Sequence, residues 1–292
     1  MIKTLKIGIF LLFLGNTTFA SDSLSVKSHN KKLYTVLGSE AAIYAVGYTG
    51  LNYLWYADYP RSSFHFFNDS KEWLQMDKCG HSYSTYWIAR GNYKLFKWAN
   101  LTDKQATLSS LASSWLFIST IEVFDGFSSE YGASPEDLIA NTAGASLFGL
   151  QQYFWNEQKI IYKFSYYPSQ YAKLRPDALG ATPVERLLKD YNAQIYWLST
   201  GLRTITGIKA IPEWLNLAIG YGADGMTGAE NNKGVLPESK RIRQFYISFD
   251  INTEKIKSKN SFVKFLLLGL NCIKVPLPTI EFNKNNTKVL IR

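Results

Sequence analysis

The stretch Ser134-Pro135-Glu136-Asp137, which opens the run SPEDLIANTAGASLFGLQQYFW over residues 134–155, decides the class of fold expected for this chain. Serine favours the position before a helix, proline fits the first helical position, and an acid is favourable in the first turn. The pattern therefore predicts a helix that continues towards Trp155. Nearly all of it is free of charge, because Leu138–Asn156 contains no Asp, Glu, Lys or Arg.

Two further helices are expected before this one. They run over Ser70–Ala89 and over Asp103–Phe124, where Gly126 provides the stop signal. Ala41–Ala57 and Gln105–Ile121 also lack charged residues and are each 17 residues long, close to the length that spans a bilayer. Both contain several polar side chains, which are costly in the middle of a membrane. We interpret them as buried helices of a compact bundle, with true membrane spans as the alternative.

The C-terminal part of the chain has a different pattern of apolar residues and glycines. A short helix is expected near Val184–Leu198, and the glycines of Gly220–Gly228 indicate a turn-rich segment. Gln244–Ile251 alternates apolar and polar residues and so predicts a half-buried strand. Ser261–Ile273 resembles a short apolar helix, and residues 280–291 suit a hairpin. The predicted fold class is mainly α, a helical bundle with a smaller, partly β C-terminal region.

The first 20 residues follow the pattern of a cleavable signal peptide. Lys3 and Lys6 precede the apolar run Ile7–Leu14, and Thr18-Phe19-Ala20 offers small residues at the two positions read by a signal peptidase. We therefore expect cleavage after Ala20. No cysteine lies near that site, so a lipid anchor is not expected. The two cysteines of the chain, Cys79 and Cys272, do not define a disulfide framework by their spacing.

The excess positive charge lies in one region. Residues 21–228 carry 18 basic and 18 acidic side chains, whereas residues 229–292 carry 12 basic and 5 acidic ones, a net charge of +7. We therefore divide the mature chain into a helical domain (21–165), a loop-rich helical extension (166–228) and a basic α/β region (229–292). An exported protein without a nucleic-acid motif is not expected to bind nucleic acid. An anionic membrane surface or envelope polymer is the expected partner, and a solvated face is the alternative.

Polar residues recur on helix faces that should be buried. Asp77 and His81 are four residues apart and share a face of the first predicted helix. Glu122 falls on the apolar stripe of the second helix, with Asp125 at its edge. In the third helix, a polar pair shares a face with apolar residues, namely Asp137 and Asn141.

Buried carboxylates are unfavourable unless they are paired or bound to a cation, and two explanations follow. One is a site for a divalent metal or for acid–base catalysis, with four candidate residues: Asp77, His81, Glu122 and Asp125. The other is a structural network in which donors neutralise the acids, formed by Lys78, His81, Asp137, Asn141 and the hydroxyls of Tyr83 and Tyr86. The spacings alone do not distinguish the two.

The combination of these motifs resembles a known family. The segments Asp77-Lys78-Cys79-Gly80-His81, Glu122-Val123-Phe124-Asp125-Gly126 and Tyr131-Gly132-Ala133-Ser134 are similar to those of the YfiM-like predicted periplasmic lipoproteins, a bacterial family of unknown function. The D-K-x-x-H element also resembles VanZ-like membrane proteins. Residues 63–67 and 194–198 are similar to longer, Bacteroidetes-type members, and the resemblance covers most of residues 55–282. The missing lipid-accepting cysteine is a departure from the lipoprotein pattern.

These observations favour an exported protein of the cell envelope, either periplasmic or associated with the outer membrane. We expect it to be membrane-associated and non-enzymatic. The alternative is a metal-assisted hydrolase that acts on an envelope lipid or glycan through Asp77, His81, Glu122 and Asp125.

Overall fold

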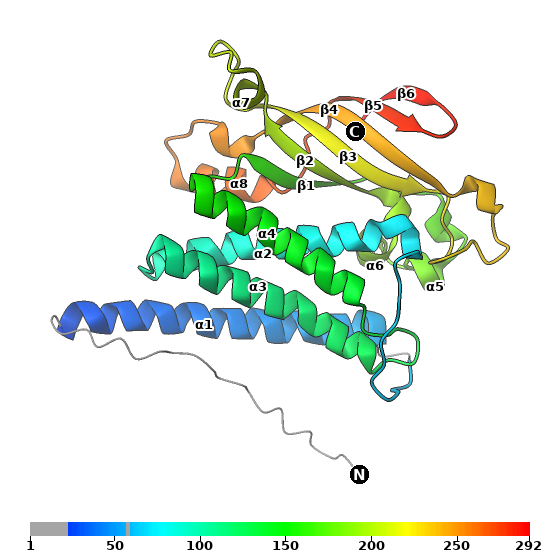
Figure 1. Ribbon diagram of the computed structural model, residues 1–292, viewed down its shortest axis with the longest axis horizontal. Coiled ribbons are helices and arrows are strands. Elements are labelled where there is room, and N and C mark those ends of the chain that lie inside the picture. The colour runs from blue at the N-terminus through cyan, green and yellow to red at the C-terminus, as the bar shows by residue number, and fades with distance from the viewer. Residues whose placement is uncertain (1–22, 57–58) are drawn as a thin grey trace.

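The computed structural model describes residues 23–56 and 59–292, so the predicted signal peptide (1–20) lies outside the described residues. Four long helices lie side by side in the N-terminal half (Figure 1). They are α1 (Ser23–Leu51), α2 (Met76–Trp98), α3 (Asp103–Gly126) and α4 (Pro135–Trp155). A π-helical segment, η1 (Asn52–Tyr56), extends α1, and a short 3₁₀ helix, η2 (Glu72–Gln75), precedes α2. The helices predicted over residues 103–124 and 134–155 are confirmed, and the first predicted helix begins and ends later than expected.

Local capping explains where α3 and α4 begin. Thr102 and Gln105 form a reciprocal capping box at the start of α3. At the start of α4, the Ser134 hydroxyl accepts a hydrogen bond from the Asp137 amide, and Pro135 occupies the first helical position. The cap residues read from the sequence therefore place α4, and with it Asp137 and Asn141, as predicted.

The second half of the chain forms a six-stranded antiparallel sheet in which every strand pairs with its neighbours in the sequence. The strands are β1 (Ile160–Tyr166), β2 (Gln194–Gly201), β3 (Leu215–Asp224), β4 (Ile242–Ile251), β5 (Pro278–Asn283) and β6 (Thr287–Ile291). The predicted fold class was therefore wrong. The molecule is not a helical bundle with a small β region, because the sheet forms a second layer beside the helices (Figure 1).

Two misread segments account for most of this error. The helix expected over residues 184–198 ends at Lys189, in α6 (Pro183–Lys189), and the chain then enters β2. The glycine-rich segment expected to turn begins inside β3. Gly220 lies under the ring of Trp197, and a Cβ there would be 2.6 Å from Trp197 Cε3. Close packing against an indole, and not a turn, explains this glycine.

Other parts of the C-terminal prediction were confirmed. The strand expected over residues 244–251 is β4 without its first two residues, and the expected hairpin is β5–β6. The apolar helix is α8 (Ser261–Leu270). The remaining short elements are η3 (Tyr171–Lys173), α5 (Pro176–Leu179), η4 (Tyr191–Ala193), α7 (Leu202–Thr206), η5 (Glu238–Lys240) and η6 (Thr253–Lys255). Cys79 and Cys272 are both free thiols. The division into regions at residues 165 and 228 stays a prediction.

An aromatic cluster joins the helical layer to the sheet. Tyr83 of α2 packs against Tyr162 of β1 and Tyr196 of β2, with ring centroids 5.5 and 5.7 Å apart. Met76, at the start of α2, is fully buried in the same cluster. Such large apolar contacts fix α2 on the first two strands.

The uncharged segments are less buried than predicted. Val46 and Tyr53, in the first of them, have exposed fractions of 74% and 79%. Of the helices in the described ranges, α3 alone combines the length and apolar composition needed to cross a membrane. In its most apolar stretch of 18 residues, 28% is buried. A core helix of a soluble protein can meet the same criteria. The apolar surfaces of these helices are therefore turned outward to a larger extent than a compact bundle would require.

Candidate functional site

Close packing of α2 against α4 brings the polar residues of both helices together. Gly144 of α4 lies against the backbone of α2, and a Cβ at this position would overlap the Ser82 carbonyl oxygen. His81 precedes that contact by one residue, and its ring Nδ1 lies 3.1 Å from Asn141 Oδ1. The absence of a side chain at Gly144 thus lets the two helices approach closely enough for His81 and Asn141 to make contact, which a larger residue would prevent.

Lys78 forms the centre of the first half of the site. Its ammonium lies 2.5 Å from Asp69 Oδ2 and 2.9 Å from both Asp77 Oδ2 and Asp137 Oδ1. The Ser134 hydroxyl donates a hydrogen bond of 2.7 Å to Asp69 Oδ1. Three carboxylates from two helices and the preceding loop therefore share one cation.

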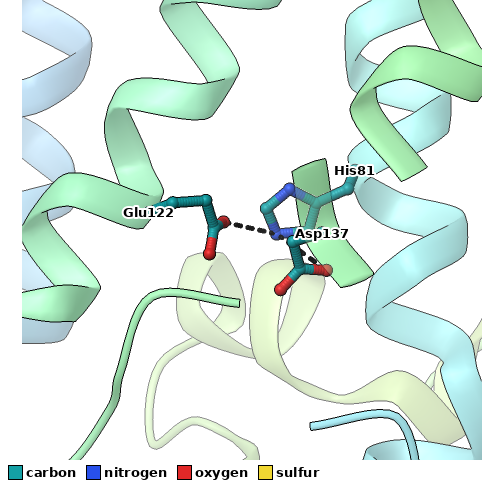
Figure 2. A group of neighbouring side chains, drawn as sticks. All are labelled: His81, Glu122 and Asp137. Carbon is teal, nitrogen blue, oxygen red and sulfur yellow. Dashed lines mark ion pairs between the residues drawn. The ribbon is translucent and has the colours of Figure 1, made fainter. Parts of the chain in front are cut away.

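His81, Glu122 and Asp137 form the second half, and Figure 2 shows one imidazole nitrogen facing both carboxylates. His81 Nε2 lies 3.8 Å from Glu122 Oε1 and 3.8 Å from Asp137 Oδ1. The other Glu122 oxygen, Oε2, accepts a hydrogen bond of 2.9 Å from the Ser134 amide. Among the described residues, the buried Glu122 Oε1 has no hydrogen-bond partner, and Asp137 Oδ1 has no well-directed one although Lys78 lies 2.9 Å away.

The orientation of the imidazole follows from Asn141. The Asn141 amide nitrogen donates to Ser119 Oγ, so its oxygen faces His81 Nδ1 as an acceptor. Nδ1 is then the protonated nitrogen of a neutral ring, and Nε2 carries the lone pair. That lone pair points to the side of the ring where Glu122 and Asp137 lie.

Burial raises the carboxyl pKa values on this side of the site. Burial, and secondarily the charge of Asp137, raises the pKa of Glu122 to about 9. Burial also raises the pKa of Asp137 to about 6, with His81 acting in the opposite direction. For Asp69, hydrogen bonds from Lys78 and Ser134 outweigh burial and lower the pKa. Near Lys78, the pKa of Asp69 is thus lowered whereas burial raises that of Asp77, and on the other side Glu122 is a carboxyl that favours its protonated form.

Not all predicted site residues lie in this arrangement. Asp77, His81 and Glu122 belong to it, together with the predicted network residues Lys78, Asp137 and Asn141. Asp125 instead accepts a hydrogen bond of 2.8 Å from Tyr56 of η1, and burial raises its pKa to about 6.

The hydroxyls of Tyr83 and Tyr86 were expected to satisfy the acids, and this was wrong. They donate to backbone carbonyls, those of Cys272 and Ile160. Two contributors were missed: the Asp69 carboxylate and the backbone amide of Ser134. Asp69 lies in a loop outside any helical periodicity, so no sequence pattern connected it with Lys78.

Comparison with known proteins gives one match. Residues 65–153 match a family model described as "Predicted periplasmic lipoprotein (DUF2279)". The matched segment contains α2, α3 and all but the last two residues of α4, and it includes every residue of the two halves of the site. The match supports export to the periplasm. No curated protein and no solved structure matches this chain.

Proposed function

We propose that this exported protein is a non-enzymatic, membrane-associated component of the cell envelope, and that one face of its sheet is seated in lipid. The observation that supports the proposal is a reversal of polarity across the sheet. The face on which α2 packs is apolar and is exposed beyond α2, whereas the opposite face is buried and holds charged and polar side chains beside Trp197 and Tyr246. A protein surrounded by water alone has the opposite arrangement.

The register of the strands defines the apolar face. Residues that are directly paired across an antiparallel sheet point to the same side. Five such residues form one row from β2 to β6, and all are exposed: Leu198, Ile219, Ile247, Ile280 and Val289. Phe245 and Phe249 flank the row on β4, with exposed fractions of 52% and 49%. We call this surface the apolar face; α2 covers its β1–β2 end, through Tyr162 and Tyr196.

The polar face lies on the other side of the same strands. Lys163 and Asp250 are fully buried there and form an ion pair of 2.8 Å. Ser199 donates a hydrogen bond of 2.6 Å to Asp250, and Glu281 is also fully buried. Charged groups have thus been removed from the surface while large apolar groups remain on it. This distribution is favourable where the surroundings of the apolar face are hydrocarbon.

The basic region contributes a second element suited to a membrane surface. α8 exposes Phe262, Phe265 and Leu270, and the exposed lysines Lys257 and Lys259 precede it. An apolar helix beside lysines is typical of helices that lie at the interface of anionic membranes. The net charge of +7 over residues 229–292 acts in the same direction.

Flotation of the mature protein with lipid vesicles tests the proposal. The test variant replaces Ile219, Ile247 and Ile280 together by serine, which removes the centre of the apolar face. The matched control replaces three residues of α6 with closely similar exposure, Val184, Leu187 and Leu188.

We expect the wild type and the α6 control to float with neutral vesicles, and the sheet variant to stay in the dense fraction. Adding anionic lipid should strengthen binding, and high salt should cancel that increase, because surface charges are screened over about 8 Å at physiological ionic strength. A folded sheet variant that floats as well as the wild type would contradict the proposal. A wild type that does not bind vesicles would contradict it as well.

A further inference from the structure

Three side chains of the site, those of His81, Glu122 and Asp137, each bring one ligand atom to within 4.8 Å of the other two. His81 Nε2 lies 3.8 Å from both Glu122 Oε1 and Asp137 Oδ1. The side chains of Glu122 and Asp137 are more than nine-tenths buried, and neither of these two oxygens has a well-directed hydrogen bond. A buried oxygen without a partner is unfavourable, which applies to Glu122 Oε1 among the described residues. It faces the same imidazole nitrogen as Asp137 Oδ1, which Lys78 also contacts, at 2.9 Å.

We propose that His81, Glu122 and Asp137 bind a divalent transition-metal ion such as Zn²⁺. One imidazole nitrogen and two carboxylate oxygens are a ligand set suited to such an ion. Ligand atoms around a tetrahedral Zn²⁺ are about 3.4 Å apart for bonds of about 2.1 Å. The two observed separations of 3.8 Å therefore need only a small inward movement of the side chains.

The charge balance of the site favours a divalent ion. Asp69, Asp77 and Asp137 together carry three negative charges when ionised, and Lys78 neutralises one of them. Two uncompensated charges remain before Glu122 is counted. A divalent ion beside Asp137 would balance them and would allow Glu122 to ionise as a ligand.

The surrounding contacts are those that orient metal ligands. Asn141 holds His81 by Nδ1, so that Nε2 is the nitrogen presented to the two carboxylates. The Ser134 amide holds Glu122 by Oε2, so that Oε1 is presented. The neighbouring carboxylate triad, formed by Asp69, Asp77 and Asp137, is a poorer candidate, because the Lys78 ammonium already occupies it.

Titration calorimetry of the metal-free, full-length mature protein with ZnCl₂ tests the inference. We expect one site per chain, and a rise in melting temperature on adding Zn²⁺, because a ligand that binds only the folded state stabilises it. Glu122→Gln, which keeps the shape of the side chain, and His81→Gln, which keeps a polar side chain without the imidazole ligand, should each weaken binding at least tenfold. Asp125→Asn is the matched control, since Asp125 is a partly buried acid of the same helix as Glu122 and accepts a hydrogen bond from Tyr56, and this variant should bind Zn²⁺ as the wild type does.

Circular dichroism of each metal-free variant separates loss of a ligand from loss of the fold, and the two glutamine variants are independent of each other. No Zn²⁺ binding by the folded wild type would overturn the inference. It would also be overturned if folded Glu122→Gln and His81→Gln bound Zn²⁺ as tightly as the wild type, because the ion would then lie elsewhere. Neither result would bear on vesicle binding by the apolar face.

Discussion

Breaking the buried ion pair of the polar face should destabilise the protein strongly. Lys163 and Asp250 are both fully buried, 2.8 Å apart, and the Lys163 ammonium has one further acceptor, the Ile251 carbonyl at 2.7 Å. Asp250→Asn keeps the shape of the side chain but leaves the ammonium unpaired, which costs roughly 3–5 kcal/mol for a buried pair. At roughly 2–4 °C per kcal/mol for a large domain, the melting temperature should fall by about 6–20 °C.

Thermal unfolding followed by circular dichroism at pH 7 measures this effect. Lys163→Met combined with Asp250→Asn removes both charges and should recover most of the loss, because an apolar replacement of a buried pair is often neutral. Asp177→Asn is the control, since its partner Arg175 lies at the surface and the exposed pair should contribute less than about 1 kcal/mol.

The pH dependence of this effect has a definite sign. Burial lowers the pKa of Lys163, although Asp250 opposes the shift. Removing Asp250 lowers it further, so the penalty in Asp250→Asn should shrink as pH rises and the amine loses its proton. A loss below about 1 kcal/mol at pH 7, or a double variant no more stable than the single one, would refute the reasoning.

Three other predictions follow from single residues. Mass spectrometry of the mature protein should find Ser21 at the N-terminus, and recovery of uncleaved protein from the envelope would contradict this. Gly144→Ala should lower the melting temperature because its methyl group meets the α2 backbone, whereas Gly91→Ala, with nothing within 4 Å, should be neutral or slightly stabilising. Burial raises the pKa of Glu40 to about 7 despite a hydrogen bond from Ser113. The folded state therefore holds this proton more tightly, and Glu40 should contribute to a decline in stability from pH 4.5 to pH 7, so that the decline is smaller in Glu40→Gln.

The sequence was sufficient to predict the site residues that lie on α2, α3 and α4, because local signals and tertiary structure agree there. Ser134 and Pro135 fix the start of α4, and the four-residue spacing of Asp77 and His81 is a property of any helix. Periodicity alone placed Glu122 on an inward face, and it is buried. What periodicity could not supply was the contact between helices, which depends on the close approach at Gly144.

The sheet was harder to predict because its strands do not follow the usual alternation. β2 is buried on both faces at its start, where Ile195, Tyr196 and Trp197 are consecutive, so it has no polar side to reveal a period of two. β3 contains glycines that pack under Trp197 and Tyr246. Large apolar residues of the sheet, such as Ile219 of β3, also face outward. The usual assumption that apolar residues are buried therefore predicts the wrong face of the sheet as the buried one.

The order of the strands bears on how an exported chain can fold. Each strand pairs with the one that follows it, from β1 to β6, so no strand must wait for a distant partner. Closing a short loop costs less entropy than closing a long one, and folding dominated by local contacts is fast. A chain that crosses a membrane from its N-terminus would present α2, α3 and α4 first and then extend the sheet at a single edge. Unpaired backbone groups would then be confined to the growing edge and to the outer edge of β1, which later pairs at Phe164 with residues 272–274. This limits the opportunity for aggregation during translocation.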